Sequence, residues 1–75
     1  MVRLPRISGD QAVRVLRKLG FTVVRQRGSH VVLRKETDDG ATGCVVPLHD
    51  ELSIGTLHGI LQQANVKPAD FLAHL

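Results

Sequence analysis

Two histidines near the middle of the chain, His30 and His49, are the residues best suited to transfer protons. The unperturbed pKa of imidazole, about 6.5, suits general acid–base catalysis at neutral pH. His30 directly follows the pair Gly28-Ser29, and His49 comes two residues after Pro47. A histidine in a strand is often only a solvated surface residue. Whether His30 and His49 are catalytic or only solvated therefore depends on the side chains that the fold places around them.

The segments around both histidines predict two β-hairpins. Residues 21–27 and 30–36 are rich in β-branched side chains, and a glycine-first pair between them is typical of a type II′ turn. With Gly28-Ser29 as the loop, Arg27 faces His30 and Val24 faces Leu33. With Asp39-Gly40 as the second loop, His49 faces His30, Val46 faces Leu33, and a third strand lies at the sheet edge.

Alternation of side chains sorts these strands into an apolar face and a cationic face. The apolar face collects Val24, Val31, Leu33, Cys44, Val46 and Leu48, and the cationic face collects Arg25, Arg27, His30, Arg34, Pro47 and His49. A sheet of this kind needs helices on its apolar face only. Phe21 and Val23 fall on the cationic face in this register. Their position indicates a twist or bulge in the first strand, or a first turn displaced by one residue.

Helical patterns before and after the strands predict what covers the apolar face. Ser8 and Gln11 form a capping box for a helix over 9–19. A second helix follows Ser53, with an apolar stripe at Leu57, Ile60, Leu61 and Ala64. A short segment over 68–75 begins with proline. The elements together predict an α+β fold of order α-β-β-β-α, with a three-stranded antiparallel sheet and helices on one face.

Length and composition limit the classes of function. Seventy-five residues and 8.2 kDa predict a single domain over residues 1–75, too small for an enzyme with a large cofactor. The 43% apolar and 23% charged composition is that of a folded protein. No apolar run approaches the ~18 residues of a membrane span, and the N-terminus has no secretory pattern. We therefore expect a cytoplasmic protein without membrane contact.

Charge is distributed unevenly along the chain. Nine of the ten basic residues but only one of the seven acidic residues lie within residues 1–35. This asymmetry indicates a surface that could meet a polyanion such as nucleic acid. A dipolar protein that docks an acidic protein partner would have the same pattern.

Most catalytic arrangements fit the sequence poorly. Ser29 and His30 are adjacent, so in a strand they point apart and cannot form a nucleophile–base pair. Cys44 falls on the apolar face, and as the single cysteine it cannot form an internal disulfide. His30 and His49 lack a third metal ligand in register, with Asp50 the nearest candidate, so we predict no metal site. An RNA substrate would supply its own nucleophile, the 2′-hydroxyl, and would need only an acid, a base and cationic groups.

Three segments carry a resemblance to a known family. The segment Gly-Phe-Thr-Val-Val-Arg-Gln-Arg-Gly-Ser-His over 20–30, the triplet Pro-Leu-His over 47–49 and the helix sequence over 55–64 resemble the HicA toxin family, in the same order along nearly the whole chain. The resemblance implies a double-stranded-RNA-binding-domain-like fold and a metal-independent mRNA endoribonuclease that needs no cofactor. It also implies a HicB-type antitoxin partner that masks the active site. The catalytic histidine of the family corresponds to His30, whereas a role for His49 as second acid or base, or as RNA contact, is our hypothesis.

Three functions follow from these observations as hypotheses. The first is an endoribonuclease toxin in which His30 is catalytic and the RNA-binding residues are Arg25, Arg27, Gly28, Ser29 and Arg34. The second is a non-catalytic RNA-binding module of the same fold. The third is an adapter whose basic half docks an acidic protein.

Overall fold

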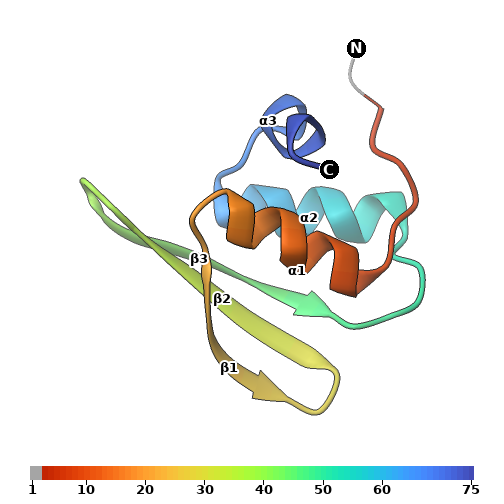
Figure 1. Cartoon of the computed structure of the whole chain (residues 1–75), viewed down its shortest axis with the longest axis horizontal. Coiled ribbons are helices and arrows are strands. Elements are labelled where there is room, and N and C mark those ends of the chain that lie inside the picture. The colour runs from red at the N-terminus through yellow and green to blue at the C-terminus, as the bar shows by residue number, and fades with distance from the viewer. Residues whose placement is uncertain (1–2) are drawn as a thin grey trace.

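Three helices and three strands follow one another in the predicted order (Figure 1). The computed structural model describes residues 3–75. The elements are α1 (Gly9–Lys18), β1 (Thr22–Arg27), β2 (His30–Thr37), β3 (Gly40–Pro47), α2 (Ile54–Ala64) and α3 (Pro68–Ala73). The strands form one antiparallel sheet in the order β1-β2-β3. The predicted α+β class and α-β-β-β-α order are confirmed.

The predicted N-terminal caps begin the two longer helices. The Ser8 hydroxyl accepts a hydrogen bond from the Gln11 amide at 3.0 Å, and the Gln11 side chain accepts one from the Ser8 amide at 3.0 Å. This capping box begins α1 as predicted. At the start of α2, the Ser53 hydroxyl accepts a hydrogen bond from the Thr56 amide at 3.1 Å. Asn65, in the left-handed conformation with φ of +56°, ends α2.

The first hairpin has the predicted turn but contains a bulge. Arg27 pairs with His30 and Arg25 with Val32, as predicted, but Val23 takes the predicted place of Val24 opposite Leu33. Val24 is the extra residue of this β-bulge and is 54% exposed, so its predicted position on the apolar face is wrong. Side chains N-terminal to the bulge therefore point to the sheet face opposite to the predicted one, which is why Phe21 is buried rather than exposed on the cationic face.

The second hairpin has a different loop from the predicted one. Thr37 pairs with Gly40, so the loop is Asp38-Asp39 and not Asp39-Gly40. Gly40 has φ of +130° and is the first residue of β3, where this backbone conformation requires glycine. Moving the loop by one residue shifts the register by two, and a shift of two leaves every side chain on its face. The apolar face is therefore as predicted on β2 and β3, whereas the cross-strand partners are not.

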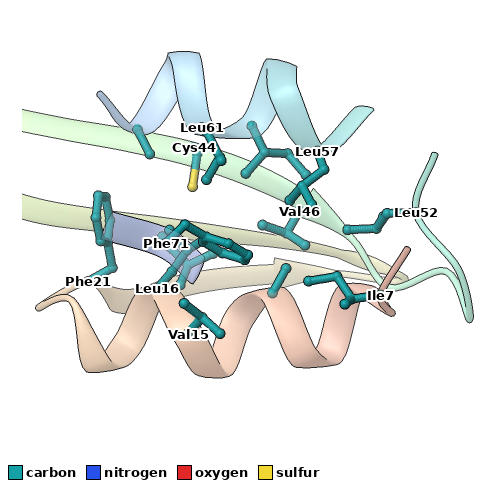
Figure 2. Close-up of a cluster of buried hydrophobic side chains, with 14 of the residues drawn as sticks. Ile7, Val15, Leu16, Phe21, Cys44, Val46, Leu52, Leu57, Leu61 and Phe71 are labelled. Carbon is teal, nitrogen blue, oxygen red and sulfur yellow. The ribbon is translucent and has the colours of Figure 1, made fainter. Parts of the chain in front are cut away.

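The core lies between the sheet and the helices. Its buried side chains are Leu4, Ile7, Ala12, Val15, Leu16, Phe21, Val31, Leu33, Cys44, Val46, Leu52, Leu57, Ile60, Leu61, Ala64 and Phe71. Figure 2 shows the Phe71 ring among these residues, between α1 and α2, so α3 closes the core with one fully buried side chain, and Leu72 packs beside the core. The helices all lie on one side of the sheet (Figure 1), and no element within residues 3–75 covers the opposite side, which we call the open face.

Candidate functional site

The first β-turn places His30 at the edge of the open face. Gly28 has φ of +54°, which a type II′ turn requires at its first central position and which glycine adopts without strain. The Gln26 side chain donates to the Gly28 carbonyl at 3.0 Å and braces the same turn. His30 is the first residue of β2, pairs with Arg27 and is exposed. The imidazole is therefore available to a ligand at this end of the sheet.

His49 lies at the same end of the sheet as His30 but not opposite it. Pro47, the last residue of β3, is the cross-strand partner of His30, so the predicted pairing of the two histidines is wrong. The cause is the two-residue register shift of the second hairpin. The Leu48 amide donates to the Ser29 carbonyl at 2.6 Å, so the chain remains bound to the first turn as it leaves β3. His49 follows directly and is exposed.

The first residue of α1 holds the His49 backbone from the other side. The Gly9 amide donates to the His49 carbonyl at 2.9 Å. A Cβ atom at Gly9 would collide with the Pro47 carbonyl oxygen and would lie 2.9 Å from the Leu48 Cα. Only glycine permits so close an approach of the helix to this strand end. Main-chain hydrogen bonds thus join three elements at the site: the first turn, the end of β3 and the start of α1.

The three predicted arginines lie on the open face but differ in their charge partners. Arg25 faces Val32 and Arg27 faces His30. Arg34 Nε contacts Glu36 Oε1 at 3.2 Å, an exposed ion pair along β2 that the sequence analysis missed. Residues two apart on a strand share a face, which is the signal that could have revealed it. Within residues 3–75, neither Arg25 nor Arg27 forms an ion pair, so these two keep free positive charge on the same face as His30.

The remaining reactive side chains lie elsewhere. His58 is exposed on α2, and His74 follows α3 with its Nδ1 2.9 Å from the Asp70 carbonyl oxygen. Cys44 is buried in the core, and burial raises the pKa of its thiol to about 11. The part of the chain that the structure describes contains no cluster of three or more metal-ligating side chains. It also contains no helix long and apolar enough to cross a bilayer.

The open face also carries a shallow apolar hollow that the sequence analysis did not identify. Residues of all three strands line it, and it has a volume of about 670 Å³. Val24, Val32 and Val45 line it, and the side chain of Gln63 from α2 forms one rim. No local sequence signal brings Gln63 to the sheet, because it reaches β3 from 18 residues along the chain.

The fold and the site define a small α+β protein with histidines and arginines on an uncovered sheet face. Residues 9–66 match the family model described as the HicA toxin of bacterial toxin–antitoxin systems. The match begins at the first residue of α1, ends just beyond α2 and includes both site histidines. The chain therefore belongs to the HicA toxin family, whose members are known as mRNA interferases. A comparison with individually curated proteins finds no match.

Proposed function

We propose that residues 1–75 form a single toxin domain that cleaves mRNA in the cytoplasm without a metal ion, using His30 as general acid or base. In this reaction the RNA 2′-hydroxyl loses its proton to a base and attacks the adjacent phosphorus. The bond from phosphorus to the 5′-oxygen breaks, and an acid protonates the leaving oxygen. The products are a 2′,3′-cyclic phosphate and a 5′-hydroxyl.

The observation that carries this proposal is the exposed imidazole of His30 opposite Arg27, at the end of an uncovered sheet face. A proton-transfer group needs to reach the substrate, and the exposure of His30 allows this. The guanidinium groups of Arg25 and Arg27 can stabilise the negative charge that grows on the phosphate oxygens during attack. Membership of the HicA family supports the same reading.

His49 is the candidate for the second proton-transfer group. His49 directly follows Leu48, whose amide donates a hydrogen bond to the Ser29 carbonyl, so the backbone at His49 is fixed to the turn that carries His30. One imidazole acting as base and the other as acid would account for both proton transfers. Contact with the RNA alone is the other role for His49, and the pH profile of cleavage separates the two.

RNA binding is proposed for the arginines and for the first turn. Arg25, Arg27 and Arg34 supply positive charge along the open face. The backbone amides of Gly28 and Ser29, next to His30, can donate to a phosphate. The ion pair with Glu36 weakens the contribution of Arg34. A HicB-type antitoxin that covers this same face would block the substrate, which is the inhibition that the family implies.

Replacing His30 by alanine tests the proposal, with His58→Ala as the matched control. His58 is exposed on α2, so its loss removes an imidazole without touching the open face. We expect His30→Ala to lower the rate of RNA cleavage by roughly 10²–10⁴-fold, whereas His58→Ala keeps it. Both variants should keep the circular dichroism of the unmodified chain. Cleavage that survives His30→Ala would rule out this residue as catalyst. RNA binding without any cleavage would favour the non-catalytic module, and cleavage that stops in a chelator would refute the metal-free reaction.

A further inference from the structure

The hollow on the open face lies beside the candidate site, and the reaction proposed above makes no use of it. Val32 pairs with Val45 and Arg34 with Gly43, so these four residues share one face of β2 and β3. His30 belongs to the same face of β2 and precedes Val32 by two residues, about 7 Å along a strand. The hollow therefore lies within one nucleotide's reach of a phosphate bound at His30.

Three local features make this part of the face apolar and concave. The bulge in β1 leaves Val24 54% exposed at one side, and Val45 is 40% exposed on β3. Gly43 contributes no side chain, so the β3 backbone itself forms part of the floor. Exposed valines that surround a hollow are a common feature of small-molecule and ligand sites.

Gln63 is an uncharged polar residue of the hollow, beside Arg34 and Thr42. Its Oε1 accepts a hydrogen bond from the Val45 amide at 3.4 Å, and its own carbonyl accepts one from the Thr42 hydroxyl at 3.2 Å. These contacts bring the side chain around the edge of β3. Because the amide oxygen is engaged, the Nε2 group retains both hydrogens for a ligand.

We propose that this hollow binds an unpaired base of the RNA substrate, next to the phosphate at His30. The flat face of a base is apolar and fits the valines, whereas its polar edge carries acceptors that Gln63 Nε2 can satisfy. The neighbouring arginines favour a polyanion over an uncharged ligand, and Arg25, directly opposite Val32, can hold the phosphate of the same nucleotide. This inference rests on the proposed function, because it assigns a subsite to the same RNA.

The variant Gln63→Glu tests the hollow, and Gln62→Glu is its matched control. The glutamate at 63 can still accept from the Val45 amide but has no hydrogens to donate. Gln62 is exposed, lines a separate hollow with Lys67 and Pro68, and undergoes the same change in charge. Val32→Thr is a second variant, which keeps the β-branched shape and places a hydroxyl group in the floor.

The probes are four short single-stranded RNAs that differ only in their central base, so their design does not depend on cleavage by the chain. Binding is measured in the His30→Ala background, so that the RNA stays intact. We expect the best and worst bases to differ roughly tenfold in Kd. Gln63→Glu should abolish or reverse that preference, and Gln62→Glu should keep it. Val32→Thr should weaken binding of all four RNAs by roughly threefold.

The outcomes separate this subsite from the proposed function. Equal binding of all four RNAs, or an unchanged preference in Gln63→Glu, overturns the base subsite even if the chain cleaves RNA. If the chain cleaves no RNA but shows a base preference that depends on Gln63, the subsite is supported and the proposed nuclease activity is ruled out. If Gln63→Glu weakens binding of a HicB-type antitoxin but leaves RNA binding unchanged, the hollow docks a protein and the base subsite is wrong.

Discussion

Replacing Gly9 by alanine should destabilise the protein although alanine is the better helix former. Alanine gains at most about 1 kcal/mol of helix propensity over glycine. Against this, the new methyl group collides with the Pro47 carbonyl, and crowding of a close-packed contact costs about 2 kcal/mol. Moving the strand end away also weakens the bonds from Gly9 to His49 and from Leu48 to Ser29, together about 2 kcal/mol. The balance is a loss of about 3 kcal/mol.

Urea unfolding followed by circular dichroism measures this loss as a midpoint lowered by about 2 M. Gly59→Ala is the control, because Gly59 lies inside α2 and a Cβ atom there has no neighbour within 4 Å. We expect Gly59→Ala to raise the stability by up to about 1 kcal/mol. If Gly9→Ala unfolds at the same urea concentration as the unmodified chain, α1 does not press on the end of β3 and the account of how His49 is held fails.

Two further predictions concern the open face and the core. Glu36→Gln should release Arg34 and tighten RNA binding a few-fold at low salt, because an exposed ion pair contributes at most about 1 kcal/mol. High salt screens these charges, so no gain is expected there. Asp70→Asn on α3 is the control, since it makes the same change in charge and should leave the Kd, measured by fluorescence anisotropy, unaltered. Equal Kd values for the two variants would show that Glu36 does not restrain Arg34. Burial raises the pKa of the Cys44 thiol to about 11, so the folded state favours the neutral thiol. The free energy of unfolding that this preference contributes is fully present below about pH 9 and is lost as the pH rises from about 9 to 11. Urea midpoints should therefore fall more steeply over that range in the unmodified chain than in Cys44→Ala, and parallel curves would contradict the burial.

The sequence predicts the helices and the sorting of the sheet faces well, because both depend on local or periodic signals. Ser8 and Gln11 begin α1 by bonding to each other's backbone, which any chain with this spacing can do. The apolar face of β2 and β3 survives an error in the loop, since a register shift of two residues moves no side chain to the other face. Strong local patterns therefore lead to the correct architecture even where a turn is misplaced.

The details of the site are less predictable, because they depend on contacts between distant segments. Asp38, Asp39 and Gly40 allow two hairpin loops, and only the packed structure decides that His30 faces Pro47 rather than His49. The positions of Phe21 and Val23 in the sequence indicate a bulge in the first strand or a displaced turn, and the structure shows the bulge, at Val24. Gln63 reaches the sheet from the second helix, 18 residues along the chain from Val45. Each of these contacts changes the site without changing the fold.

The main-chain bonds at the site have a consequence for how such toxins diverge. Two backbone hydrogen bonds hold the site together, one from Leu48 to Ser29 and one from Gly9 to His49. Backbone atoms are present whatever side chains surround them. In the function proposed above, residues elsewhere on the open face can therefore be exchanged, for a new antitoxin or a new transcript, while the backbone at His30 and His49 keeps its place. A scaffold of this kind lets recognition evolve independently of chemistry.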